Sequence, residues 1–334
     1  MIAMNKKLTK IKCVNGITYH TATTEILNCI NDYYDFIDSD DPDFIMFGPY
    51  GNDIPREGNY VRIGYFCENF IPDLSICEWA FGVPYAEEIK SEKYMRIEWH
   101  GFNPNALIKK DLDLDEIIAR KTKFCNFVYS NPVLFRERFF KALSKHKHID
   151  APGKSMNNMP SFDLDKQGDI WQRKQSFLSE YKFTIAFENY SYPGYNTEKL
   201  LDPMLANSLP IYFGNPYIDK HFNTKSFINA HEYITSNNSW AVNFLERNCH
   251  PNFEDIRPST FNSFPNKVKR KIKTIGRNFK INWQYENFDD LIDYIVQVDQ
   301  NDSLYANYLS EPWLHNNKPT SNQTVVDRWR KIFG

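Results

Sequence analysis

The sequence has few glycines and no long apolar run near its start. Only 13 of its 334 residues are glycine, and none forms the G-x-G-x-x-G or Walker patterns that hold nucleotide phosphates. A Rossmann dehydrogenase or a P-loop enzyme is therefore disfavoured. Residues 1–20 contain no apolar segment long enough for a signal peptide or a membrane anchor. These features favour a cytoplasmic protein.

Neither charge nor cysteine spacing indicates a nucleic-acid partner or a zinc site. The formal net charge of −2 offers nucleic acid no general electrostatic attraction. The six cysteines lack the close pairs that bind zinc, and we expect them to stay reduced. With 334 residues, 26 of them phenylalanine and 20 tyrosine, the chain is long enough for two domains with separate cores.

Residues 182–229 form the most informative stretch. Large apolar residues at 183, 185 and 187 alternate with small ones, which predicts a strand. Thr197 is a suitable N-cap for a helix that follows a polar loop, and residues 209–213 are a second expected strand. In the first half of the chain, residues 10–14, 44–47 and 60–66 are expected strands, and 24–38 is an expected helix. This alternation predicts parallel α/β structure.

The start of the helix after Thr197 suits an anionic ligand. Unpaired N–H groups and the positive end of the helix dipole gather there, and Lys199 adds a full positive charge. The carboxylate of Glu198 suits the paired hydroxyls of a ribose. The alternative is an exposed helix start without a ligand.

The longer string Phe187-Glu188-Asn189, Gly194-Tyr195-x-Thr197-Glu198-Lys199 and Pro210-Ile211-Tyr212-x-Gly214 resembles the donor signature of the α-1,3/4-fucosyltransferases. The resemblance is to the bacterial, Helicobacter-type lipopolysaccharide enzymes of glycosyltransferase family 10. It implies GDP-fucose as the donor and assigns donor binding to five residues, namely Arg136, Asn189, Tyr195, Glu198 and Lys199. Arg136 would contact the pyrophosphate, although neighbouring Arg138 shows that a surface arginine is the alternative.

Glu68 is the candidate general base. It follows the expected strand 60–66, and a carboxylate at that end of a strand points toward the ligand crevice of an open α/β sheet. The sequence Glu68-Asn69-Phe70-Ile71-Pro72 also resembles the catalytic segment of the family. The alternative is an exposed loop glutamate.

The resemblance implies a GT-B fold, in which two Rossmann-like domains face each other across a cleft. We expect an acceptor-binding domain at 1–118, a GDP-fucose-binding domain at 119–312 with an insertion at about 234–286, and a C-terminal tail helix at 313–334. The last helix is expected to return to the first domain.

The implied reaction is an inverting α-1,3-transfer of L-fucose to the GlcNAc of an N-acetyllactosamine-type acceptor, giving a Lewis x-like product on a surface glycan or lipopolysaccharide. No metal or cofactor is required on this interpretation, which leaves room for non-essential stimulation by Mn²⁺ or Mg²⁺. Asp38-Ser39-Asp40 matches the metal-binding Asp-x-Asp pattern, but a solvated acidic linker is the preferred interpretation. Other GDP-sugars, α-1,4 or α-1,2 linkages, and a non-catalytic nucleotide- or fucose-binding module remain open.

Residues 267–280 lie in the insertion, and their spacing of apolar and basic residues predicts a basic amphipathic helix. Val268, Ile272, Ile275 and Phe279 define one stripe, and the segment contains no acidic residue. The helix could bind an anionic membrane surface, giving a peripheral location at the inner membrane. The preferred alternative is a stripe packed on the donor domain with its lysines in water.

Overall fold

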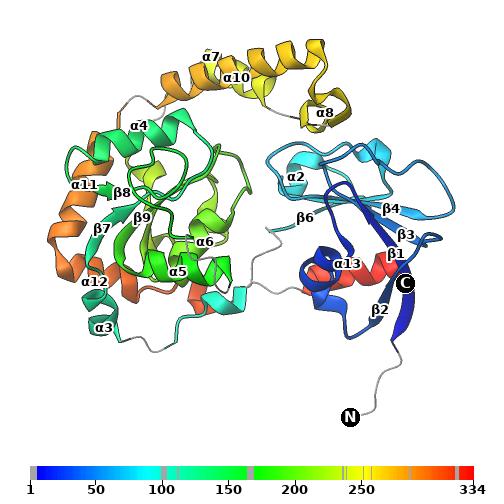
Figure 1. Cartoon of the computed structure of the whole chain (residues 1–334), viewed down its shortest axis with the longest axis horizontal. Helices are drawn as coiled ribbons and strands as arrows, with labels where there is room; N and C mark the ends of the chain where they lie inside the picture. The colour runs from blue at the N-terminus through cyan, green and yellow to red at the C-terminus, as the bar shows by residue number, and fades with distance from the viewer. Residues whose placement is uncertain are drawn as a thin grey trace. The chain divides into compact units, whose positions relative to one another are not determined.

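Two parallel β-sheets form the framework, and each belongs to its own compact unit (Figure 1). The computed structural model describes residues 6–98, 104–110, 113–163, 169–234, 237, 239–250, 252–256, 258–285, 287–319 and 323–334. Unit 1 comprises Met1–Gly101, Arg247–Gly276 and Ser321–Gly334, and unit 2 comprises Phe102–Glu246 and Arg277–Thr320. The two-domain α/β organisation is therefore confirmed.

The first sheet has the strand order β2-β1-β3-β4-β5-β6, and all neighbouring strands pair in parallel. Its strands are β1 (Lys7–Val14), β2 (Tyr34–Asp38), β3 (Phe44–Phe47), β4 (Val61–Phe66), β5 (Trp79–Gly82) and β6 (Tyr94–Arg96). The strand order reverses between β1 and β3. Such a reversal in an open α/β sheet is where ligands bind, at the carboxyl ends of the strands.

The second sheet has the order β11-β10-β9-β7-β8 and is also parallel throughout. Its strands are β7 (Lys123–Asn126), β8 (Ile149–Asp150), β9 (Tyr181–Phe187), β10 (Leu209–Phe213) and β11 (Ile228–Asn229). Counted in chain order within the unit, this is the same doubly wound arrangement as in the first sheet. Here the reversal lies between β7 and β9.

The central strand β9 shows why the sequence folds in this way. Its large side chains, at 183, 185 and 187, are buried in the core that contains α4 (Leu134–Leu143) and α11 (Asp289–Gln300). On the opposite face, Thr184 shares a hydrogen bond of 2.7 Å with Ser208, in the connection between α6 (Glu198–Leu205) and β10. The alternation of large and small residues therefore places helices on both faces, as parallel sheets require.

The expected helix at 24–38 is wrong. The chain forms short helical turns, α1 (Tyr19–Thr21), a π-helical turn at Ala22–Ile26 and a 3₁₀ turn at Asn28–Ile30, before β2 begins at Tyr34. The apolar residues of this segment fit the period of a helix and also that of a strand. Parallel pairing with β1 stabilises the strand. Tertiary pairing thus overrides the local helical pattern.

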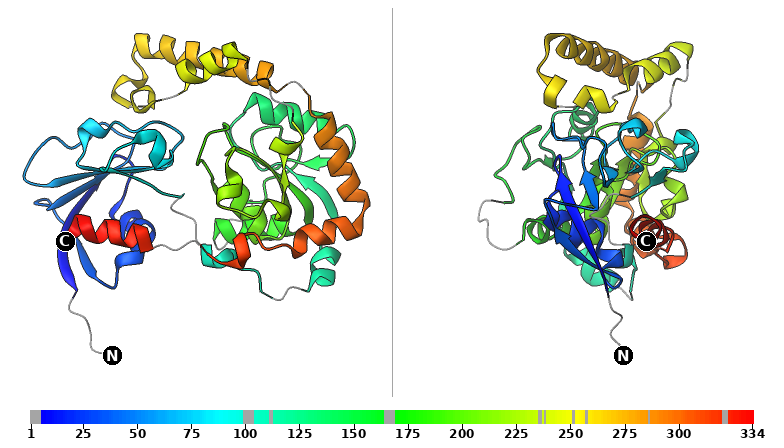
Figure 2. Two further views of the ribbon diagram at one scale, coloured as in Figure 1. Left: turned by 180° about the vertical axis from the view of Figure 1, so that it is seen from behind. Right: turned by 90° about the vertical axis from the view of Figure 1, so that its right-hand side faces the viewer.

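The last helix, α13 (Gln323–Phe333), packs in unit 1, where the sequence placed it. Trp329 is 1% exposed and stacks on Phe81 with ring centroids 4.1 Å apart. Phe333 packs edge-on against Phe44 at 4.8 Å. The end of the chain therefore completes the core of the first sheet, and α13 is drawn in red in Figure 1 and Figure 2.

The compact units divide the chain differently from the expected boundaries at 118/119 and 312/313. Most of the expected insertion, Arg247–Gly276, belongs to unit 1, because Phe253 packs against Phe66 and Phe70 at 5.5 and 6.0 Å. Asp111 and Leu112, in the polar stretch before the expected boundary, lie outside the described residues, as do several insertion residues.

The remaining helices complete the two units. They are α2 (Ala86–Ile89), α3 (Leu114–Ala119), α5 (Ile170–Ser179), α7 (Trp240–Cys249), α8 (Phe253–Ile256), α9 (Pro258–Phe261), α10 (Phe264–Gln284) and α12 (Asp302–Ser310). None of the helices in the described part of the chain combines the length and hydropathy needed to span a bilayer.

Candidate functional site

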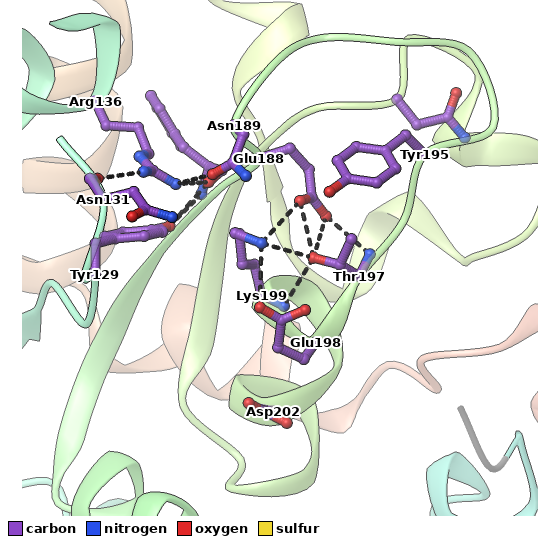
Figure 3. A network of polar contacts seen from close by, with 12 residues as sticks. Tyr129, Asn131, Arg136, Glu188, Asn189, Tyr195, Thr197, Glu198, Lys199 and Asp202 are labelled. Atoms are coloured by element: carbon purple, nitrogen blue, oxygen red, sulfur yellow. Dashed lines mark hydrogen bonds and ion pairs between the residues drawn. The ribbon is translucent and has the colours of Figure 1, made fainter. Parts of the chain in front are cut away.

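A buried ionic cluster lies at the start of α6. The ammonium of Lys199 is 3.4 Å from Glu188 Oε2 and 3.1 Å from Glu198 Oε1, and it donates to the Thr197 hydroxyl at 3.0 Å. The Glu188 side chain is fully buried, whereas 14% of the Lys199 side chain is exposed. Figure 3 shows Glu188, Thr197 and Lys199 pointing toward one another.

Glu188 organises this helix start. Its carboxylate accepts the Thr197 backbone N–H at 2.8 Å and the Thr197 hydroxyl at 2.8 Å. Thr197 in turn caps α6, because its side-chain oxygen accepts the N–H of Lys199. One buried carboxylate thus holds both the N-cap residue and the lysine of the first turn. Pro203 lies inside α6, which continues to Leu205.

The charges in the cluster stabilise one another. Burial disfavours the Lys199 ammonium, but the carboxylates of Glu188 and Glu198 outweigh that effect and raise the pKa of Lys199. Burial likewise disfavours the Glu198 carboxylate, yet Lys199 lowers the pKa of Glu198 below its ordinary value. Burial raises the pKa of Glu188, and Lys199 opposes that rise. A permanent positive charge therefore sits at the amino end of α6.

Arg136 lies near the cluster, on the helix that follows β7, the strand next to β9. It lies in α4, which follows β7, and its guanidinium lies 3.9 Å above the ring of Tyr129. One N–H donates to Asn189 Oδ1 at 2.9 Å, and another donates to the carbonyl of Asn131 at 2.8 Å. Burial lowers the pKa of Arg136. Only 1% of Arg136 is exposed, and its buried Nε has no hydrogen-bond partner among the described residues.

The reversal of strand order in the second sheet explains why Arg136 lies near the cluster. Arg136 follows β7, while Glu188 and Asn189 follow β9, and the two strands are neighbours at the switch point of the second sheet. Carboxyl ends of adjacent parallel strands meet at one edge of the sheet. Arg136, Asn189, Glu198 and Lys199 are thereby gathered in one region (Figure 3).

Tyr195 lies in the loop before α6 and is buried, with 4% exposed. The loop is held by Asn215, which is fully buried, accepts the Gly194 N–H at 3.0 Å and donates to Asn196 at 3.1 Å. Gly194 has a φ of 83°, a conformation that favours glycine. The loop backbone, and with it Tyr195, is therefore fixed by side-chain hydrogen bonds.

The sequence assigns no role to two residues that organise this region, Glu188 and Asn215. Glu188 lies within the donor signature, and Asn215 lies just beyond it. The position of Glu188 directly after a buried strand is the same signal that identified Glu68. Asn215 carries no comparable signal, because its function depends on a loop 20 residues earlier in the chain.

Glu68 lies in unit 1, just beyond the end of β4. It is partly exposed, and its Oε1 accepts the hydroxyl of Tyr50 at 2.7 Å. Tyr50 follows β3, the neighbouring strand, so the two side chains come from adjacent strand ends. Burial and the nearby Glu68 charge raise the pKa of Tyr50, which keeps its hydroxyl protonated as the donor.

Asp38 and Asp40 do not gather with other metal ligands. Lys12 lies 2.8 Å from Asp40 Oδ1 and 3.9 Å from Asp38 Oδ1, and the Asp40 side chain is 99% exposed. Throughout the described ranges, no three histidine, cysteine or acidic side chains form a group that could hold a metal ion. Both aspartates therefore lie in a solvated, lysine-paired segment.

Residues 118–248 match the family model described as glycosyltransferase family 10 (fucosyltransferase) C-term. These residues form a family 10 fucosyltransferase domain. All five expected donor-site residues lie inside it, whereas Glu68 lies outside the matched segment. The family resemblance seen in the sequence is thereby confirmed for residues 118–248, the segment that contains the buried cluster.

Relatives of the family 10 domain include the α-(1,3)-fucosyltransferase FucT of Helicobacter pylori, 35% identical over 133 residues, which are 40% of this chain and 26% of that protein. GDP-fucose protein O-fucosyltransferase 3 of Xenopus laevis is 26% identical over 211 residues, 60% of this chain and 32% of that protein. The matched regions thus span less than a third of either relative.

A crystal structure of an α1,3-fucosyltransferase with GDP has the same fold beyond the family 10 domain. The similarity covers 100% of this chain and 92% of that chain, with a TM-score of 0.66 and 21% sequence identity. This agreement extends the shared fold to both α/β units of the chain, as expected for a GT-B protein.

We predict that Glu188→Ala lowers the free energy of unfolding by about 3–5 kcal/mol, because it removes the fully buried carboxylate that pairs with Lys199 and accepts the Thr197 N–H. Denaturant unfolding measures this loss. Adding Lys199→Met should recover part of it. Glu180→Ala is the matched control, since Glu180 forms an exposed 2.7 Å pair with Lys123 and should cost less than about 1 kcal/mol. Equal losses for Glu188→Ala and Glu180→Ala would contradict the organising role of Glu188.

Proposed function

We propose that the chain is an inverting α-1,3-fucosyltransferase that moves L-fucose from GDP-fucose to the GlcNAc of an N-acetyllactosamine-type acceptor on a surface glycan or lipopolysaccharide. The observation that carries the proposal is the charged Lys199, held by Glu188 and Glu198 at the amino end of α6 within the family 10 domain. This position suits the diphosphate of a nucleotide sugar.

In the donor half of the proposed reaction, positive groups stabilise the leaving diphosphate. As the bond between fucose and the diphosphate breaks, negative charge grows on the diphosphate oxygens. Lys199 and the N–H groups at the start of α6 would stabilise that charge. Arg136 adds a second positive group, and Asn189 holds its guanidinium until the ligand arrives. Glu198 would bind ribose hydroxyls, and Tyr195 would position the nucleoside.

The acceptor half of the proposed reaction uses Glu68 as the general base. The Glu68 carboxylate takes the proton of the attacking sugar hydroxyl, whose oxygen forms the new bond to the anomeric carbon of fucose. The electron pair of the broken bond leaves with GDP, and the anomeric configuration inverts. The Tyr50 hydroxyl, 2.7 Å from Glu68 Oε1, orients the carboxylate for this proton transfer.

A second candidate acceptor is a protein hydroxyl. The similarity to a GDP-fucose protein O-fucosyltransferase covers 60% of this chain, more than the 40% covered by the Helicobacter enzyme. An assay with radiolabelled GDP-fucose, N-acetyllactosamine and folded protein acceptors distinguishes the two. Transfer of another GDP-sugar, another linkage, or binding without turnover would each replace the proposal with one of the alternatives left open by the sequence.

Glu68→Gln should lower fucose transfer by about 10²–10⁴-fold while donor binding persists, because the amide keeps the shape but cannot accept the proton. Initial rates with radiolabelled GDP-fucose measure the effect, and NMR of the product reports inversion. The control is Glu87→Gln, an exposed glutamate on α2, which should retain full activity. Near-normal turnover of Glu68→Gln would remove Glu68 from the mechanism.

Lys199→Ala and Arg136→Ala should each weaken GDP binding by about 1.5–3 kcal/mol, the contribution of one charge-assisted hydrogen bond. Calorimetric titration of the folded variants measures it, after thermal unfolding has shown that they fold. Arg138→Ala is the matched control, because Arg138 lies on the same helix but donates to Asn282. Undiminished GDP affinity in both site variants would refute the diphosphate site.

Transfer should survive EDTA, because the proposed leaving-group stabilisation uses Lys199, Arg136 and backbone N–H groups in place of a metal ion. Initial rates before and after dialysis against the chelator test this expectation. Complete loss of activity that Mn²⁺ restores would show that a cation is required. Asp38 and Asp40 would then become the first residues to substitute.

A further inference from the structure

The helix α10 exposes a continuous apolar stripe. Six large apolar side chains recur along it at spacings of four, four, three, four and four, which is one face of an α-helix. They are Phe264 (79% exposed), Val268 (41%), Ile272 (62%), Ile275 (58%), Phe279 (58%) and Trp283 (38%). The interpretation of this stripe as part of a packed core is therefore wrong.

Ion pairs hold the opposite face of α10 against the protein. Lys273 is paired with Asp255, whose side chain is 3% exposed. Farther along the helix, Lys280 is buried, paired with Glu246 and 3.0 Å from the Tyr190 hydroxyl. Two lysines thus point inward while the apolar stripe points outward, the reverse of an ordinary surface helix.

The borders of the stripe are basic. No aspartate or glutamate occurs between Asp255 and Glu286 in the sequence. At about 100° per residue, Lys267 and Lys271 fall along one edge of the stripe, and Lys269, which lies 2.9 Å from Asp255 Oδ1, falls along the other. Lys267 and Lys271 are exposed. The first half of the stripe therefore combines apolar side chains with positive charge.

The neighbouring helix α7 contributes further exposed aromatic residues. Trp240 is 79% exposed and stacks on Phe244, 52% exposed, with ring centroids 5.7 Å apart. The Glu246–Lys280 ion pair joins α7 to α10. Tryptophan side chains favour the boundary between lipid and water, so Trp240 and Trp283 suit an interfacial position.

We propose that α10 binds the surface of a lipid bilayer that contains anionic lipids. The helix would lie in the plane of the interface, with the stripe in the acyl boundary and Lys267 and Lys271 among the anionic headgroups. Charge complementarity favours this partner over a second copy of the chain, because pairing two stripes would bring basic edges together. The inference uses residues outside the proposed donor site and does not depend on fucosyl transfer.

Vesicle co-sedimentation of the full chain tests the proposal. The intact protein should bind vesicles of phosphatidylglycerol and phosphatidylcholine at low salt, should bind phosphatidylcholine alone far more weakly, and should be released by high salt. Ile272→Ser combined with Ile275→Ser should weaken binding at least about tenfold, because it removes apolar area from the stripe. Circular dichroism and thermal unfolding should remain unchanged, since both side chains are exposed.

The charge contribution is tested separately. Lys267→Gln combined with Lys271→Gln should weaken vesicle binding about 25-fold, at about fivefold for each charge. Lys141→Gln combined with Lys145→Gln is the matched control, because these exposed lysines belong to α4 and the turn after it. Three results would overturn the proposal. They are absence of binding at low salt, equal binding to neutral vesicles, and concentration-dependent dimerisation that the Ile272→Ser and Ile275→Ser changes abolish.

Discussion

The buried contact between Glu188 and Lys199 is the constraint on which the proposed donor site depends. A lysine in the first turn of a helix opposes the helix dipole, and burial adds a desolvation cost. Glu188 offsets both, since its carboxylate is 3.4 Å from the ammonium and also binds the N-cap residue Thr197. The same contact therefore fixes the helix start and keeps a positive charge there.

Sheet topology supplies the geometry around this contact. Each sheet reverses its strand order once, and in both sheets polar side chains meet at the carboxyl ends of two neighbouring strands, at the reversal in unit 2 and one strand pair away from it in unit 1. In unit 2, Arg136 and Asn189 meet in this way at 2.9 Å. In unit 1, Tyr50 and Glu68 meet at 2.7 Å. Two units of similar architecture thus each build a polar site from residues far apart in the sequence.

The sequence predicts the parts of the fold that depend on strong local patterns. The strand β9, the N-cap at Thr197 and the position of Glu68 after a strand all follow from apolar alternation and helix-start chemistry. The strand β2 was not predicted, because its apolar residues fit a helix equally well and only pairing with β1 decides. The direction in which α10 faces was not predictable either, since it depends on ion pairs with Asp255 and Glu246.

A calorimetric comparison of GDP with guanosine tests the central claim most directly, because the two ligands differ only in the diphosphate. If the charge held at the start of α6 binds that diphosphate, the intact chain should bind GDP more tightly than guanosine by at least about 1.5 kcal/mol, or roughly tenfold. The difference should shrink as salt is added. Equal affinities for GDP and guanosine would contradict the account.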